Sequence, residues 1–545
     1  MAKPPVLPAV RSKEKERKQS DQPAARSSLF PYLSGVVQHP RFALILAAAY
    51  GIILLIVGLS YHVVGDYNVE TDFFWSYVPE AKRIVHGIVT IDGFRGPAYP
   101  ILLALVAAAV RNYFTAGVVL STISAAAALG LTFALLKRLI GADKAFFVSG
   151  IMALNGIFVQ YTYTAGTDMV FNAVMTLCVY VFLRREERRY RDIVIAGLLA
   201  GAAYLMRYNG IAAVIAFLVG ILVINQFRLG WTERAKTAAV FLGAFFIVIL
   251  PYGLYCLAQK GSFFYTENYL NIAREMYRDR FTHDEFWITE APKYHSTAQV
   301  ILGNPELFVK MIVRNIYEHF VGDMDVLLGW HVGVLVLPGL LLVWRERANR
   351  RLMTFFLLFV GLFGILLLLL QQVRYSLFLL PGYLVLAVLA LSWKGLYSFR
   401  FWNRIHLGGL IAVGVLMWTF SVSYKFNRNN IDSGPKEIPV IASWFNGNFG
   451  ESERGKIIMT RKPHIAYYLD MEMTVFPMVT TEAELRQEVE KTHASYLFFS
   501  VMEAGLRPQF QHLLDPRRAP AWLIPLTYTV APPAVLYKTD LTKSP

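Results

Sequence analysis

The sequence predicts an α-helical polytopic membrane protein with a small soluble α/β domain at its C-terminus. Of its 545 residues, 55% are hydrophobic and only 17% are charged, and the mean hydropathy is +0.43. Long apolar runs recur from Phe42 to Val422, and many approach the roughly 20 residues that cross the hydrocarbon core of a bilayer. Residues 424–545 instead alternate short strand-like and helix-like segments, which is typical of a mixed α/β fold.

Positive charge is concentrated in six segments that precede or connect the apolar runs. These segments together carry +17, whereas the whole chain carries +15: 1–41, 137–144, 184–192, 227–236, 344–351 and 394–404. Such segregation is typical of cytoplasmic loops that obey the positive-inside rule, and it is not the pattern of a nucleic-acid-binding surface. We therefore expect a cytoplasmic N-terminus and no nucleic-acid partner.

Placing the basic segments in the cytoplasm predicts eleven transmembrane helices. The predicted spans are 42–60, 114–136, 145–163, 166–183, 193–206, 211–226, 237–257, 326–343, 352–370, 376–393 and 405–423. An odd number of spans puts the C-terminal domain outside. The apolar stretch 97–111 is only about 15 residues long, and counting it as a span would invert every later loop. We therefore expect it to be a helix at the outer membrane surface, or a re-entrant helix.

This topology divides the chain into three parts. They are a basic cytoplasmic leader (1–41), a transmembrane domain (42–423) with outer loops 61–113 and 258–325, and a soluble extracytoplasmic α/β domain (424–545). No small-residue cleavage site follows the first span, so it is expected to be a retained anchor. Both cysteines, Cys178 and Cys256, lie inside apolar runs, which predicts neither a disulfide framework nor a cysteine metal site.

The first outer loop holds the residues that are most informative about function. Asp72 follows the first span, a helical segment runs on to Gly87, and Arg95 and Pro97 lead into the short apolar helix. Charged residues also stand at the predicted outer ends of later spans, in Thr167-Asp168, Arg207-Tyr-Asn-Gly210 and Arg374-Tyr-Ser-Leu-Phe-Leu-Leu-Pro381.

This arrangement resembles the GT-C superfamily of membrane glycosyltransferases. The most similar branch contains the protein O-mannosyltransferases and the aminoarabinose transferase of lipid A, and Asp72, Gly87, Arg95 and Pro97 fit its first-loop pattern. The resemblance covers most of 42–423. It departs at Trp75, where the lipid A branch has an arginine, so a donor-phosphate contact there would be missing. The WWDYG-type signature of oligosaccharyltransferases is also absent, which weakens the case for transfer of a whole glycan.

The resemblance implies an inverting glycosyltransferase that moves a sugar from a polyprenyl-phosphate donor to an acceptor hydroxyl on the extracytoplasmic side. It makes Asp72 the candidate catalytic base, because a nearby carboxylate can take the proton of the attacking hydroxyl. Arg95, Arg207 and Arg374 are candidates for donor phosphate binding, since arginine can hold a phosphate with two donors. In the alternative, structural interpretation, Asp72 caps a helix, and Arg207 and Arg374 reach toward lipid headgroups.

Several neighbouring residues are supporting candidates: Asp168, Tyr77, Glu80, Lys82 and Tyr375. Asp168 could equally cap the fourth span, and Glu80 and Lys82 equally fit a solvated helix face. Tyr77 belongs to an aromatic run that fits a substrate groove or an interfacial belt. The second-loop histidines, such as His283, His295 and His319, lack a specific metal-ligand spacing. No metal ligand is therefore assigned, although the resemblance leaves a divalent metal ion open.

Two other classes of function compete with this hypothesis. A transporter or flippase of lipid-linked substrates predicts charged residues in mid-span, whereas the acids here stand at the outer ends. A non-catalytic membrane scaffold does not need acids and arginines gathered at one face. The sequence identifies neither the sugar nor the acceptor, which could be a lipid, a glycan or a protein. We expect the chain to lie among the lipids of a bacterial inner membrane, with its C-terminal domain in the periplasm.

Overall fold

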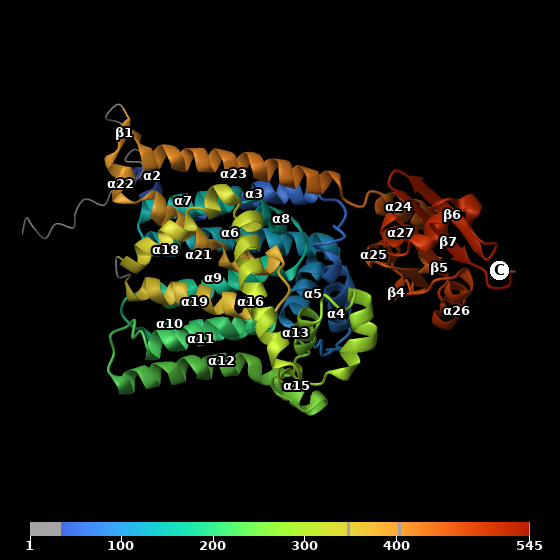
Figure 1. The fold of residues 1–545 in the computed structure, drawn as a ribbon, viewed down its shortest axis with the longest axis horizontal. Coiled ribbons are helices and arrows are strands. Elements are labelled where there is room, and N and C mark those ends of the chain that lie inside the picture. The colour runs from blue at the N-terminus through green and yellow to red at the C-terminus, as the bar shows by residue number, and fades with distance from the viewer. Residues whose placement is uncertain (1–33, 346–348, 402–404, 544–545) are drawn as a thin grey trace, which may run out of the picture.

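The computed structural model describes residues 34–345, 349–401 and 405–543 and shows a helical bundle with a small mixed domain at one end (Figure 1). The bundle is built from α2 (Ser34–Gln38), α3 (Phe42–Ser60), α6 (Tyr113–Leu139), α7 (Ala142–Leu154), α8 (Gly156–Tyr163), α9 (Thr167–Leu183), α10 (Tyr190–Met206), α11 (Ile211–Leu222), α12 (Trp231–Lys260), α16 (Pro305–Gly322), α18 (Val336–Arg345), α19 (Arg350–Leu366), α21 (Leu380–Leu391) and α23 (Leu407–Asp432). Most of the predicted leader, residues 1–33, lies outside the described residues.

Nine of the eleven predicted spans coincide with one helix of the bundle or with a large part of one. The other two are broken, because 145–163 is divided between α7 and α8, and 326–343 is divided between the end of a π-helical turn, a short helix (Trp330–Gly333) and α18. By length and composition, five helices in the described part of the chain could cross a membrane, or seven if each of two sharply bent pairs is one span. One such pair is α7 with α8, which bend by 62°. The expectation of eleven crossings therefore goes beyond what helix length supports, because helices such as α9 and α11 are short and largely buried inside the bundle.

Glycine residues allow helices α10 and α12 to pack closely in the bundle. A Cβ atom at Gly197 would lie 2.4 Å from the carbonyl oxygen of Phe241, and one at Gly201 would lie 2.7 Å from the Val248 side chain. The two glycines are four residues apart, so they share one helix face. Small residues at this spacing let helix backbones approach closely in a membrane.

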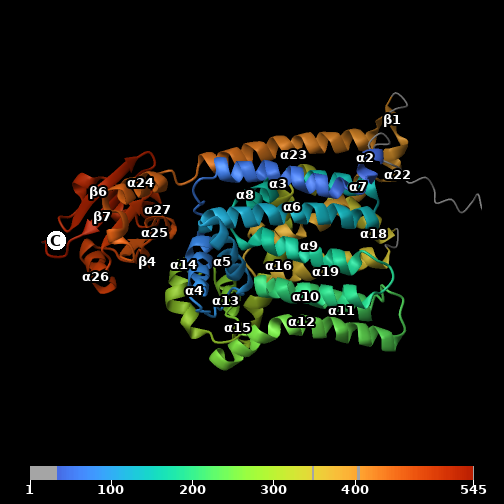
Figure 2. The same cartoon turned by 180° about the vertical axis from the view of Figure 1, so that it is seen from behind.

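The outer loops fold into short helices at the end of the bundle nearest the C-terminal domain (Figure 2). The first loop contains a π-helical turn (Phe73–Tyr77), α4 (Val78–Val85) and α5 (Ala98–Val110), and α5 is the predicted short apolar helix. The second contains α13 (Tyr269–Met276), α14 (His283–Glu285) and α15 (Thr297–Gly303). The connections between α9 and α10 and between α11 and α12, which are two of the basic segments, lie at the opposite end.

The C-terminal domain, residues 433–543, has a five-stranded sheet in the order β4-β3-β5-β7-β6. Its elements are α24 (Glu437–Phe449), β3 (Ile457–Thr460), α25 (His464–Leu469), β4 (Glu472–Val475), α26 (Glu482–Thr492), β5 (Tyr496–Ser500), α27 (Val501–Leu506), β6 (Leu523–Val530) and β7 (Pro533–Thr539). Strand β3 pairs in parallel with β4 and β5, whereas β7 is antiparallel to β5 and β6. Four of these strands match strand-like runs of the sequence, at 456–460, 495–500, 521–528 and 534–538, and two of the helices match helix-like runs at 438–446 and 481–492. Strand β4 was missed because an edge strand with Glu472 exposed has no buried apolar face.

Candidate active site

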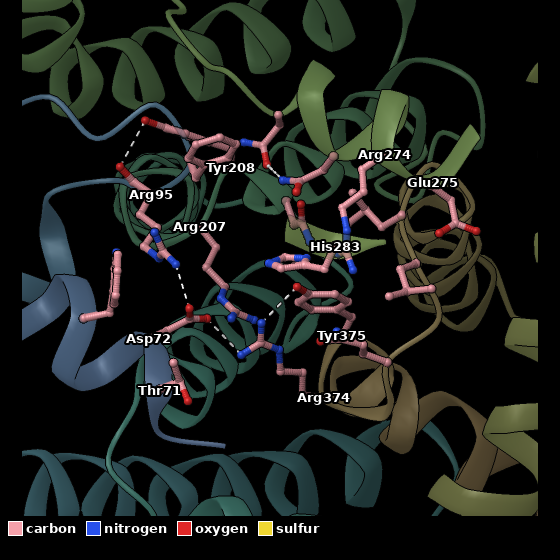
Figure 3. Close-up of a pocket in the computed structure, with 18 of the residues that line it drawn as sticks. Thr71, Asp72, Arg95, Arg207, Tyr208, Arg274, Glu275, His283, Arg374 and Tyr375 are labelled. Atoms are coloured by element: carbon pink, nitrogen blue, oxygen red, sulfur yellow. Dashed lines mark hydrogen bonds and ion pairs between the residues drawn. The ribbon is translucent and has the colours of Figure 1, made fainter. Parts of the chain in front are cut away.

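A cavity of about 640 Å³ lies between the outer loops, the bundle and the C-terminal domain. Its lining includes Asp72, Tyr77, Arg95, Arg207, Tyr208, Arg274, Glu275, His283, Arg374, Tyr375 and Arg461. These residues come from both predicted outer loops, from the outer ends of helices and from the C-terminal domain, as Figure 3 shows for most of them. The fold therefore gathers residues that are nearly 400 positions apart in the sequence.

Asp72 lies between two arginines on one side of this cavity (Figure 3). Its Oδ1 is 2.8 Å from Nη2 of Arg95, and its Oδ2 is 3.0 Å from Nη1 of Arg374. All three side chains are partly buried, with 18–31% of each exposed. The predicted base and two of the predicted phosphate-binding residues thus meet at one point, although Arg374 is 302 residues away along the chain.

The arginines decide the charge state of Asp72. Burial by itself raises the pKa of the Asp72 carboxyl, but the charges of Arg374 and Arg95 outweigh burial and lower that pKa from 3.8 to about 2. Asp72 is therefore ionised at any physiological pH. It is also a weak base as long as both arginines remain bound to it.

Arg207, at the end of α10, also lines the cavity, and it forms an ion pair with a different carboxylate. Its Nη1 is 2.8 Å from Oδ1 of Asp168, which stands in the first turn of α9. Its guanidinium also lies over the rings of Tyr375 and Phe378, at 6.0 and 5.6 Å. Asp168 is buried behind Arg207 and is not among the lining residues of the cavity. We expect it to orient Arg207 rather than to contact a substrate.

Glycine allows the loop that carries Arg95 to come close to the last turn of α10. A Cβ atom at Gly96 would lie only 2.0 Å from the carbonyl oxygen of Leu205, so a larger residue at position 96 would push the loop away from α10. Asp92 holds the same loop through Nη1 of Arg95 at 3.2 Å, and the Tyr208 hydroxyl donates to the Arg95 carbonyl oxygen at 3.2 Å.

The two predicted tyrosines lie beside the arginines. Arg95 packs over the Tyr77 ring at 5.7 Å, while Nη2 of Arg374 donates to the Tyr375 hydroxyl at 3.0 Å. Glu80 and Lys82 lie elsewhere, outside the cavity lining. Glu80 pairs with Arg83, and Lys82 reaches Asp470 of the C-terminal domain at 2.9 Å.

Glu70 joins the segments that carry the two acids. It is fully buried and accepts hydrogen bonds from Nε2 of His62 at 2.8 Å and from the backbone N–H of Ala165. Asp72 follows Glu70 by two residues, and Asp168 follows Ala165 by three. The sequence does not distinguish Glu70 from its neighbours, because burial between two distant segments leaves no local signal.

The C-terminal domain completes the cavity through the turn after β3. Arg461 lines the cavity, while Nζ of Lys462 donates to the Tyr67 carbonyl oxygen at 2.8 Å and to Oγ1 of Thr71 at 3.0 Å. Lys462 thereby holds the turn that presents Asp72. The sequence predicts none of these roles, because a turn 389 residues after Asp72 carries no local pattern that indicates its tertiary neighbour.

Of the second-loop histidines, His283 lines the cavity, whereas His319 is buried against the carbonyl oxygen of Leu369 and His295 is exposed in the loop before α15. Within the described ranges, no group of three or more histidine, cysteine, aspartate or glutamate residues is placed to hold a metal ion. Arg274 and Glu275 of α13 also reach the cavity, and the loop sequence alone did not distinguish them from other solvated charges.

Comparison with known proteins agrees with this fold. Residues 95–255 match the sequence family described as dolichyl-phosphate-mannose-protein mannosyltransferase. No curated protein matches the chain.

Solved structures with a similar fold include the following two. One is ArnT from Cupriavidus metallidurans bound to undecaprenyl phosphate, at 12% identity and a TM-score of 0.55, covering 93% of this chain and 100% of that one. The other is the archaeal oligosaccharyltransferase AglB from Archaeoglobus fulgidus in complex with an inhibitory peptide and a dolichol-phosphate. It has 13% identity and a TM-score of 0.56, covering 92% of this chain and 75% of that one.

These findings confirm the resemblance that the first-loop pattern indicated. The matched segment begins at Arg95 and includes Asp168 and Arg207, so it contains one of the two carboxylates and two of the arginines described above. Over residues 95–255 this chain is therefore similar in sequence to the family described as dolichyl-phosphate-mannose-protein mannosyltransferase, and over nearly its whole length its fold is similar to that of ArnT.

Proposed function

We propose that this protein is an inverting glycosyltransferase that moves a sugar from a polyprenyl-phosphate donor to an acceptor hydroxyl. The observation that carries the proposal is the Asp72 carboxylate between Arg95 and Arg374 in an open cavity at one end of the bundle. A base with two cations, each about 3 Å from it, suits a reaction that removes a proton and releases a phosphate.

In this reaction the acceptor oxygen attacks the anomeric carbon of the sugar in a single displacement. Asp72 takes the hydroxyl proton as the new carbon–oxygen bond forms. The bond between the anomeric carbon and the phosphate oxygen breaks, and its electron pair leaves with the lipid phosphate. Arg95, Arg374 and Arg207 stabilise the charge that develops there. Attack from the side opposite the phosphate inverts the anomeric carbon.

Donor binding also removes the difficulty that Asp72 is a weak base. The pKa of Asp72 is low because Arg374 and Arg95 lie beside it. A lipid phosphate gives both arginines a second anionic partner. Their hold on Asp72 then weakens and its pKa rises toward the ordinary value, so the base becomes stronger when the donor is in place.

We also propose that the cavity faces the extracytoplasmic side of the membrane, in a bacterial inner membrane. The basic connections at the opposite end of the bundle support this orientation. A flipped polyprenyl-phosphate sugar can supply the cavity there, where nucleotide sugars are absent. The acceptor remains open among lipids, glycans and proteins.

The test is transfer of a radiolabelled sugar from polyprenyl phosphate in membranes that contain the protein. The wild type is expected to transfer sugar, and the Asp72→Asn variant to lose at least about a hundredfold in rate, as loss of a general base typically costs. Asp66→Asn, which removes an acid from the same loop outside the cavity lining, serves as the matched control. Full activity of a folded Asp72→Asn variant would overturn the mechanism.

A further inference from the structure

Resting on the proposed function, we propose that the cavity contains a second anion-binding subsite, formed by Arg274, His283 and Arg461, that holds a phosphate or carboxylate group of the acceptor. This subsite is distinct from the Asp72, Arg95 and Arg374 cluster. Figure 3 shows Arg274 and His283 together, across the cavity from Asp72.

The first argument is the charge balance of the cavity. Five arginines line it, but only two acidic residues do, Asp72 and Glu275. Asp72 is already shared by Arg95 and Arg374, and Arg207 is matched by Asp168 behind it. A donor with a single lipid phosphate would satisfy the cluster around Asp72 and leave the positive charge on the other side unmatched.

Arg274 is the clearest case of unmatched charge. Among the residues that the structure describes, no carboxylate lies within ion-pair distance of it. Its neighbour Glu275 is engaged by Arg278 at 3.1 Å and by Arg314 at 2.8 Å. Burial lowers the pKa of Arg274, which reflects the cost of holding a guanidinium away from water without a counter-ion. An anionic ligand in the cavity would remove that cost.

Arg461, which belongs to the C-terminal domain, also adds positive charge that is not fully matched by carboxylates. Its Nη2 is 2.9 Å from Oδ1 of Asp284, and the other oxygen of Asp284 is 2.9 Å from Nη2 of Arg507. One carboxylate therefore serves two arginines. The Nε of Arg461 is buried and lacks a hydrogen-bond partner among the described residues. It is a donor that a ligand oxygen could satisfy.

His283 lies within the electrostatic reach of both arginines. Burial lowers the pKa of its imidazole, and the positive charges of Arg274 and Arg461 lower that pKa further. The ring is therefore neutral near pH 7 and can donate one N–H to an anion. Two guanidinium groups and an imidazole N–H form a set of donors that suits a phosphate or carboxylate.

The position of the subsite favours the acceptor over the donor as the source of the anion. Arg461 belongs to the soluble domain, which lies beyond the end of the helical bundle (Figure 1). A polyprenyl chain keeps its phosphate near the membrane interface, where Arg374 stands at the start of an apolar helix. A charged group that enters from the soluble side would meet Arg461 and Arg274 instead.

The experiment uses the full-length protein in nanodiscs and measures the thermal unfolding midpoint at constant ionic strength. Inorganic phosphate is titrated against chloride, with and without saturating undecaprenyl phosphate. We expect phosphate to raise the midpoint in both conditions. We also expect Arg274→Gln and Arg461→Gln each to weaken phosphate binding about tenfold, the effect of one charge-assisted hydrogen bond. Both variants should bind undecaprenyl phosphate within about twofold of the wild type.

Lys82→Gln is the matched control, because it removes a positive charge from the same domain contact but outside the cavity. Arg274→Lys and Arg461→Lys keep the charge, so they should bind phosphate more tightly than the glutamine variants. Loss of the phosphate effect once undecaprenyl phosphate is bound would overturn the proposal, because only the donor site would then bind anions. Equal phosphate binding by the wild type and both glutamine variants would overturn it too. Failure of the wild type to bind undecaprenyl phosphate would instead count against the proposed function.

Discussion

At the scale of single residues, the site depends on how charge is shared around Asp72. Arg95 and Arg374 hold one oxygen each, so the carboxylate is ionised and fixed in place. In the proposed mechanism the same two arginines also bind the donor phosphate. They therefore couple donor binding to the strength of the base, and each can be tested separately from Asp72.

Replacing Arg374 should mainly weaken binding of the donor. Arg374→Gln removes a charged donor from the phosphate position, and we expect undecaprenyl phosphate to bind about tenfold more weakly or worse. Arg374→Lys keeps the charge but not the two-pronged geometry, so its affinity should lie between those of the glutamine variant and the wild type. Quantitative binding of undecaprenyl phosphate to the purified protein checks both. Wild-type affinity in Arg374→Gln would contradict the assigned role.

The low pKa of Asp72 also predicts how stability depends on pH. Its pKa is about 2 in the fold and 3.8 in its absence, so its ionised form stabilises the folded protein above about pH 4. That contribution, at most about 2 kcal/mol, is lost as the pH falls from about 4 through 2. The unfolding midpoints of wild type and Asp72→Asn should differ by a constant amount from pH 5 to 8 and converge below pH 4. A difference that changes between pH 5 and 8 would be inconsistent with this pKa.

At the scale of elements, one turn of the C-terminal domain and one pair of helices decide whether the site is assembled. The turn after β3 brings Arg461 to the cavity and Lys462 to the backbone before Asp72. The close contact of α10 with α12 positions α10 in the bundle, and Arg207 directly follows the last residue of that helix.

Lys462→Met should slow sugar transfer without weakening donor binding. The change keeps the length of the side chain but removes its hydrogen bonds to Tyr67 and Thr71, so the turn that carries Asp72 is less firmly held. Each such bond contributes about 1 kcal/mol, and we expect a fall in kcat of about tenfold with an unchanged affinity for undecaprenyl phosphate. Equal losses of kcat and of donor affinity would instead indicate general damage to the fold.

Substitutions at two glycines test the contact between α10 and α12. Gly197→Val on α10 places two methyl groups against the α12 backbone, where even one Cβ atom would lie 2.4 Å from an oxygen, and should destabilise the protein by about 1–3 kcal/mol. Gly243→Val on α12 is the control, because nothing lies within 4 Å of its Cβ position. Thermal unfolding in nanodiscs compares the two. Similar midpoints for both variants would contradict the close α10–α12 contact.

At the scale of the whole molecule, the cavity belongs to no single part of the chain. The bundle provides Arg207 and Arg374, the outer loops provide Asp72, Arg95 and Arg274, and the C-terminal domain provides Arg461. The site is therefore shared between parts of the chain that the sequence predicts to be separate domains.

The proposed orientation can be tested with single cysteines in intact cells. Both native cysteines are buried, so they should react little with maleimide, and labelling should report mainly on the introduced cysteine. Ser452→Cys on the C-terminal domain should react with a membrane-impermeant maleimide, whereas Thr232→Cys at the basic start of α12 should react only after the membrane is opened. The reverse pattern would invert the topology and place the cavity in the cytoplasm.

The sequence by itself determined the class of fold, the apolar helices and the identity of the central acid and its arginines. Hydropathy and charge are summed over local windows, so helices such as α3 and α6 and the candidates Asp72, Arg95, Arg207 and Arg374 could be named without coordinates. Only the tertiary structure decided that Asp168 lies behind Arg207, that Glu80 and Lys82 lie outside the cavity, and that Arg274 and Arg461 lie within it. The physical reason is that a charge acts over a few ångströms in space, and the chain's sequence does not specify locally which distant segments will come that close.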